Sequence, residues 1–174
     1  KFRWEHRLPA LAAALLETEA DIIGTQEGWH SQIRQMLGML RGYRLVDEHR
    51  NWDETKMYPC LFVRSDSLDI DWSRDVWLSR HPLREGSRSF GSVFPRIMTL
   101  CGATHAGTSR KLVIGCLHLD HLSDRTRRKQ AGVAVRQLRQ AGAFEGPTLL
   151  LGDFNEAPSK AVHRLLLRKT PLVD

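Results

Sequence analysis

The feature that most constrains the fold is a run of strand-like segments between residues 43 and 118 with no convincing helix between them. Short apolar segments bounded by turn-like sequence indicate strands. They lie at residues 43–46, 59–64, 76–79, 96–105 and 111–121. The last two are joined by AGTSR, which predicts a hairpin. This order of strands argues against a fold in which parallel strands and helices strictly alternate.

Segments with helical periodicity lie on both sides of this strand-rich middle. They are expected at residues 3–20, 30–40, 123–143 and 159–169. Each presents apolar side chains on one face, and Ser123 and Ser159 stand where N-caps are expected. Further strands are predicted at 21–27 and 147–155. We therefore predict an α/β fold, a mixed sheet system covered by helices, in a single domain over residues 1–174.

The charge of the chain is unevenly distributed. The net charge is +6, and residues 88–174 carry 14 Lys or Arg against 6 Asp or Glu, whereas residues 1–87 carry 12 against 14. A basic half suits a polyanionic or phosphorylated partner, although a merely basic surface gives the same count. No apolar run is long enough to span a bilayer. We therefore expect a soluble protein, either cytoplasmic or exported.

Three of the predicted strands end in the same way, with polar residues after an apolar run. DIIGTQE ends at Glu27, LVIGCLHLDH contains His118, and TLLLGDFN ends in Asp153 and Asn155. Ligands commonly gather at the carboxyl ends of strands in sheet-based enzymes. If these strands are neighbours, a Glu, a His, an Asp and an Asn converge.

This set of side chains suits the hydrolysis of a phosphate ester. Mg²⁺ prefers oxygen ligands and keeps several waters, so one carboxylate such as Glu27 can hold it. A His–Asp arrangement can move protons near neutral pH, and an Asn can donate to a phosphoryl oxygen. Each residue also has a plainer interpretation. Glu27 could cap a helix, His118 could be structural, and Asp153 with Asn155 could build an Asx turn.

Taken together, these motifs resemble the endonuclease/exonuclease/phosphatase (DNase I-like) superfamily, in particular a bacterial branch of it. The matching segments are DIIGTQE (21–27), HLDH (118–121) and GDFN (152–155), with FGSVFPRIMT between the first two. The superfamily includes deoxyribonucleases, apurinic-site endonucleases, inositol polyphosphate 5-phosphatases, sphingomyelinases and deadenylases. The resemblance implies a four-layer sandwich of two mixed β-sheets flanked by helices.

The resemblance also implies roles for individual residues. Glu27 matches the metal-binding glutamate, and Mg²⁺, with Mn²⁺ as the alternative, is the implied cofactor. His118 matches the active-site histidine, Asp153 the aspartate that orients the water, and Asn155 the phosphate-contacting asparagine. Arg96 stands where this branch usually has an arginine. It is a candidate for phosphate binding, and a structural ion pair is at least as good an interpretation.

Two parts of the superfamily pattern are absent from the sequence. The family begins with a strand that bears a metal-binding asparagine, and it ends with a strand and an Asp-His segment. Here Lys1 lies just before the first helix, and the chain stops at TPLVD. We therefore expect a domain that is truncated at both ends and lacks the first and last strands. Whether this exact chain is active is a separate question from whether the family is active.

The alternative function is a binding module that retains the fold without catalysis. Arg125, Arg127, Arg128 and Lys129 would then bind nucleic acid or an anionic membrane surface, although a solvated basic face is the favoured interpretation of these residues. For the enzyme, the substrate could be a nucleic acid, a small phosphodiester or a phosphoinositide. The sequence does not decide between them, or indicate an oligomeric state.

Overall fold

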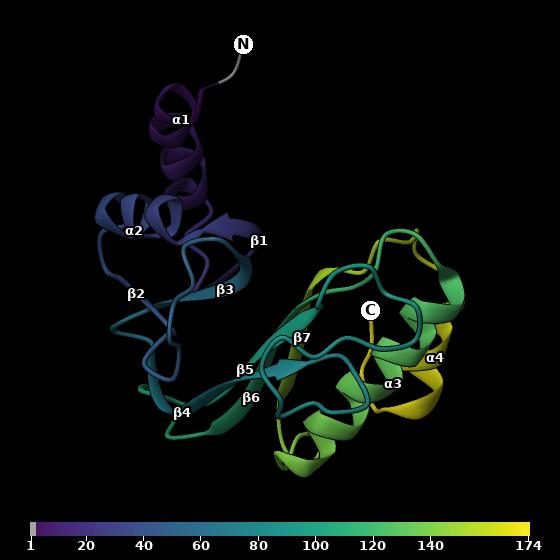
Figure 1. Ribbon diagram of the computed structural model, residues 1–174. Coiled ribbons are helices and arrows are strands. Elements are labelled where there is room, and N and C mark those ends of the chain that lie inside the picture. Colours follow the sequence, from purple (N-terminus) through teal and green to yellow (C-terminus); the bar gives the residue numbers. More distant parts are fainter. Residues whose placement is uncertain (1–2) are drawn as a thin grey trace.

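The computed structural model describes residues 3–174 and contains two β-sheets, packed face to face between two pairs of helices (Figure 1). The three-stranded sheet has the order β1-β3-β2, with β1 at Ile22–Trp29, β2 at Tyr43–Leu45 and β3 at Met57–Arg64. The four-stranded sheet has the order β4-β5-β6-β7, with β4 at Leu68–Trp77, β5 at Ile97–His105, β6 at Lys111–His118 and β7 at Thr148–Asp153.

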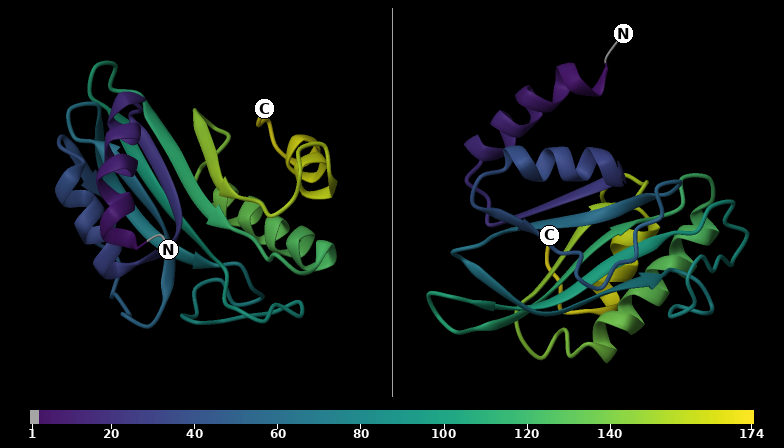
Figure 2. Two further views of the ribbon diagram at one scale, coloured as in Figure 1. Left: turned by 90° about the horizontal axis from the view of Figure 1, so that it is seen from above. Right: turned by 60° about the vertical axis from the view of Figure 1, so that its left-hand side comes forward.

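The helices form the two outer layers. Helices α1 (Trp4–Glu17) and α2 (His30–Met39) cover the three-stranded sheet, and α3 (Asp124–Gln140) and α4 (Ala161–Lys169) cover the four-stranded one (Figure 2, left). The predicted α/β sandwich of four layers is therefore confirmed. The four-stranded sheet is mixed because β6 and β7 are parallel, whereas the described pairs of the other sheet are antiparallel. No helix within residues 3–174 combines the length and apolar character needed to cross a membrane.

Alternation of side chains along the strands divides the core into three apolar clusters, one at each boundary between layers. On β3, Phe62 packs with α1 and α2, whereas Leu61 faces the other sheet. On β5, Leu100 packs with α3 and α4, whereas Cys101 lies between the sheets. All four side chains are fully buried. Both faces of each central strand are covered, which explains their continuous apolar sequence.

Two local predictions differ from the structure. The sequence indicated a short strand at 76–79, but β4 extends from Leu68 to Trp77. It is an edge strand with several partly exposed charged residues, which mask its apolar pattern. Ser123 caps α3 through a 3.3 Å hydrogen bond from the Thr126 N–H, as predicted. Ser159 does not cap α4, because the N-cap position falls on Lys160.

Candidate active site

Parallel pairing of β6 with β7 brings His118 and Asp153 together. The two residues are register partners. The Leu119 N–H donates to the Asp153 carbonyl at 2.9 Å, so the ladder continues one residue beyond β6. The Nε2 atom of His118 lies 3.9 Å from Oδ2 of Asp153. The polar ends of these two strands thus share one edge of the sheet.

Gly152 is required for this approach. Its φ is 138°, and a Cβ added there would lie 2.0 Å from the carbonyl oxygen of Leu117 on β6. A side chain at this position would collide with backbone that cannot move without breaking the ladder. The glycine before Asp153 therefore sets the place of the carboxylate.

Glu27 reaches the same place from the other sheet. The register of β1 with β3 shifts between Thr25 and Gly28, and Glu27 there has a φ of 58°. A bulge of this kind turns a side chain out of the regular alternation. Oε1 of Glu27 lies 3.9 Å from Nε2 of His118. His118 is therefore flanked by two carboxylates, one from each sheet.

Asn155 follows Asp153 in a tight turn. Its φ is 51°, and its N–H donates to Oδ1 of Asp153 at 2.8 Å. Its side-chain amide donates to the carbonyl of Leu119 at 2.9 Å. The Asx-turn geometry that the sequence left open is thus present. One amide proton and the amide oxygen of Asn155 are not used in these contacts.

Arg96 joins the cluster from the residue before β5. Its Nη1 atom lies 3.1 Å from both ring nitrogens of His118, so the guanidinium lies against the ring. Its Nη2 atom donates to Nδ1 of His121 at 2.8 Å. His121 was not among the predicted site residues. Its position in HLDH, three residues after His118, is the signal that could have indicated it.

Burial and charge determine the protonation of this cluster. Burial lowers the pKa of His118, and the positive charge of Arg96 lowers it further. Burial also lowers the pKa of Arg96, but an arginine stays charged at any physiological pH. At neutral pH we therefore expect a neutral His118 beside a cationic Arg96.

Asp120, the acidic residue of HLDH, faces the interior. It is buried, with Oδ1 accepting the N–H groups of Leu122 and Ser123 and Oδ2 accepting the Ser92 hydroxyl, all at 2.9 Å. Burial alone would raise the pKa of Asp120, but the hydrogen bonds from Ser123, Ser92 and Leu122 lower it. Asp120 therefore ties the loop around Ser92 to the start of α3.

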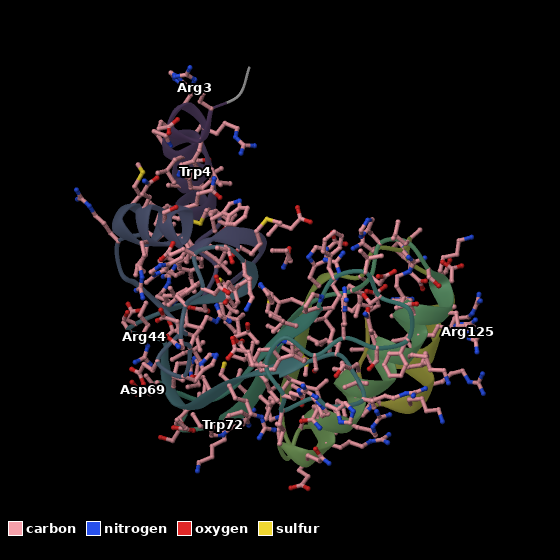
Figure 3. All side chains as sticks on the ribbon, viewed as in Figure 1. Arg3, Trp4, Arg44, Asp69, Trp72 and Arg125 are labelled. Atoms are coloured by element: carbon pink, nitrogen blue, oxygen red, sulfur yellow. The ribbon has the colours of Figure 1, made fainter. Side chains whose placement is uncertain are left out.

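The basic residues at the start of α3 do not all lie on the protein surface. Arg127 is buried and donates to the carbonyl of Asp120 at 3.0 Å. Arg125, Arg128 and Lys129 are exposed, and Figure 3 shows Arg125 on the outer side of α3. The predicted four-residue anion patch is therefore wrong in including Arg127.

The cluster opens into a cavity of about 410 Å³ between the ends of the two sheets. Within residues 3–174, no group of three or more His, Cys, Asp or Glu side chains is placed to hold a metal ion. Mg²⁺, however, usually takes one or two protein carboxylates and keeps its other waters. Glu27 is 63% exposed and accepts no hydrogen bond from the described residues. Its side chain therefore fits a hydrated divalent cation.

The two-sheet sandwich and the residues at its strand ends together define a protein of the endonuclease, exonuclease and phosphatase class. The sequence profile of the Endonuclease/Exonuclease/phosphatase family matches residues 3–172. The chain belongs to this family, as its motifs indicated.

Solved structures agree with this assignment. An endonuclease/exonuclease/phosphatase family protein from Bacteroides thetaiotaomicron is 28% identical, with a TM-score of 0.87 over 95% of this chain and 60% of its own. A mannosyl-6-phosphatase from the same bacterium is 27% identical, with a TM-score of 0.87 over 95% and 62%. The human Nocturnin catalytic domain, at 19% identity, shares the fold with a TM-score of 0.74 over 93% and 61%.

The chain thus spans about three fifths of the length of these structures. No functionally curated protein matches it. The likeness to Bacteroides proteins agrees with the bacterial branch that the sequence indicated.

Proposed function

We propose that the protein is a metal-dependent hydrolase of phosphate esters. One observation carries the proposal: Glu27 and Asp153, from different sheets, each lie 3.9 Å from the same nitrogen of His118. Two carboxylates that flank a neutral imidazole are the groups needed to hold a cation and move a proton.

Glu27 would hold the cation, Mg²⁺ or Mn²⁺. When bound, the metal supplies positive charge that polarises a phosphoryl oxygen. Arg96 adds a fixed positive charge beside His118, where it would pair with the remaining phosphoryl oxygens. The unused amide proton of Asn155 would donate to one of the same oxygens.

Asp153 would orient the attacking water. Its Oδ1 atom is held by the N–H of Asn155, which leaves Oδ2 to accept a proton from the water. The water oxygen would bond to phosphorus as the bond from phosphorus to the leaving oxygen breaks, and the leaving oxygen would take a proton from solvent to depart as the alcohol. His118, neutral at pH 7, would donate a hydrogen bond that stabilises charge on the reacting oxygens.

The similarity to the mannosyl-6-phosphatase supports phosphatase activity. Nucleic acids, small phosphodiesters and phosphoinositides are substrates to be tested alongside it. We expect the full-length protein, with Mg²⁺ or Mn²⁺, to hydrolyse at least one of mannose 6-phosphate, bis-p-nitrophenyl phosphate, DNA, RNA and phosphoinositides. Chelation with EDTA should abolish that activity.

Variants of the two carboxylates test the assignment. Asp153→Asn and Glu27→Gln should each lower kcat by about 100-fold or more, because each removes a group used in the transition state. Glu145→Gln, at an exposed position outside the cavity, is the matched control and should leave kcat unchanged. Activity retained in both site variants would contradict the proposal. Salt-sensitive DNA binding without any hydrolysis would favour the binding-module alternative.

A further inference from the structure

The cavity beside the proposed phosphate site is lined by both polar and apolar side chains. The polar groups of the proposed site are Glu27, Arg96, His118 and His121, and the other charged or hydroxyl-bearing lining residues are Thr55, Lys56, Tyr58 and Glu85. The apolar part is formed mainly by Trp29, Met57, Trp77, Phe94 and Ile97. The phosphate groups of a substrate would therefore lie next to a surface suited to a less polar group.

Three of these apolar side chains are open to solvent. Trp29 is 39% exposed, Met57 46% and Phe94 55%. Trp29 and Met57 are register partners on β1 and β3, whereas Phe94 precedes β5 of the other sheet. Large apolar side chains that gather from separate elements around one cavity are typical of a binding site.

The aromatic residues lie close in sequence to the proposed phosphate-site residues Glu27 and Arg96. Trp29 comes two residues after Glu27, and Phe94 comes two residues before Arg96. The ring of Phe94 also stacks beside the ring of His121, with centroids 6.3 Å apart. A phosphate held by Glu27, Arg96 and His118 would therefore lie in the same cavity as Trp29 and Phe94.

We propose that this cavity binds the ring of a small phosphate ester, with Trp29 and Phe94 as the specificity-determining residues. The proposal rests on the proposed phosphoesterase function and names its substrate class. Aromatic faces stack on nucleobases and on the apolar faces of sugar rings. The volume of about 410 Å³ lies within the range of small-molecule sites, about 300–1,000 Å³.

The experiment compares three phosphomonoesters with the full-length protein: AMP, glucose 6-phosphate and ethyl phosphate, which has no ring. The wild type should prefer at least one ring-bearing ester over ethyl phosphate by about 10-fold in kcat/KM. Trp29→Ala should remove that preference by raising KM for the ring-bearing esters about 10-fold, with a much smaller effect on ethyl phosphate. Phe94→Ala, in an exposed loop, tests the same point where Trp29→Ala fails to fold.

Trp72→Ala is the matched control. Trp72 on β4 is also partly exposed (Figure 3). It precedes Trp77 by five residues, which places it about 17 Å away along the strand. It should leave the substrate preference unchanged. Equal hydrolysis of ethyl phosphate and both ring-bearing esters would overturn the proposal, as would equal losses for all three in the Trp29 and Phe94 variants.

Failure of the proposed function has a different signature. In that case the wild type hydrolyses neither the three esters nor any of the substrates of the earlier test. Whenever the three esters are not hydrolysed, calorimetric binding of AMP and glucose 6-phosphate decides whether the ring site exists. Binding of either compound that weakens by about 10-fold in Trp29→Ala supports the ring site. No binding to the wild type, or equal binding to the variant, overturns it.

Discussion

At the scale of single residues, Arg50 and Asp75 form an ion pair that is almost excluded from solvent. Arg50 donates to the two carboxylate oxygens of Asp75 at 2.6 and 2.7 Å, and its guanidinium carbon lies 4.7 Å from the ring centroids of both Trp52 and Tyr58. Tyr58 also lines the cavity that contains Glu27 and His118. The pair therefore fastens the loop at 47–56 to β4 beneath that cavity.

Removal of one partner should be costly. Asp75→Asn leaves the buried Arg50 without its counter-ion, and we expect the free energy of unfolding to fall by about 3–5 kcal/mol. Urea denaturation measures this loss. The double variant Arg50→Met with Asp75→Leu should recover much of it, because neither charge is then buried. An Asp75→Asn protein that unfolds at the wild-type urea concentration would show that the pair is not stabilising.

The same pair predicts a dependence on pH. Burial alone would raise the pKa of Asp75, but the neighbouring His49 and Arg50 lower it below the model-compound value of 3.8. Because the pKa is lower in the folded state, this stabilisation is present above about pH 4 and is lost as the pH falls through the folded-state pKa. The stability difference between wild type and Asp75→Asn should therefore shrink on acidification.

At the scale of elements, the close pairing of β6 with β7 depends on Gly152. Gly152→Ala should lower the free energy of unfolding by about 2 kcal/mol or more, because the new Cβ meets the backbone of Leu117 at a positive φ. It should also lower kcat, since Asp153 is the next residue. Gly38→Ala is the matched control, because nothing lies within 4 Å of its added Cβ and alanine favours a helix.

Stability measured by urea denaturation and kcat measured on one substrate check both effects. We expect Gly38→Ala to be as stable as the wild type or slightly more so. Equal stability of the two alanine variants would mean that β7 has room to move away from β6.

The elements that sequence reasoning could identify are those with a regular pattern. Apolar runs such as those before Glu27, His118 and Asp153 are typical of buried strands. The polar residues at the ends of these strands could therefore be recognised as candidate site residues. Strand β4 was mostly missed because its charges conceal its register. Arg50 was missed because its partner Asp75 is 25 residues away, and no local pattern joins a loop residue to a strand.

At the scale of the whole molecule, the distance between the two sheets determines whether the site assembles. Gly24 on β1 lies against Leu151 on β7, and a Cβ added to Gly24 would lie 2.4 Å from the Cδ1 atom of Leu151. Glu27 follows Gly24 by three residues, and Asp153 follows Leu151 by two. Cys116 on β6 lies against the same position, with its Sγ atom 3.1 Å from the added Cβ. We therefore expect the packing at Gly24 to contribute to the gap between the carboxylates that flank His118. A single sequence carries no signal for such a contact, since the two positions belong to different sheets.

A double-mutant cycle on this pair links sheet spacing to catalysis. Gly24→Ala should lower the free energy of unfolding by about 1–3 kcal/mol through overpacking, and should lower kcat by moving Glu27 away from His118. Leu151→Ala makes room for the added methyl group, so the double variant should be more stable than the sum of the single losses by about 1 kcal/mol, with part of kcat restored. Urea denaturation and kcat are measured on all four proteins.

Losses that add within about 0.5 kcal/mol would show that the sheets do not constrain each other here. Recovery of stability without recovery of kcat would show that Glu27 is positioned by its bulge alone.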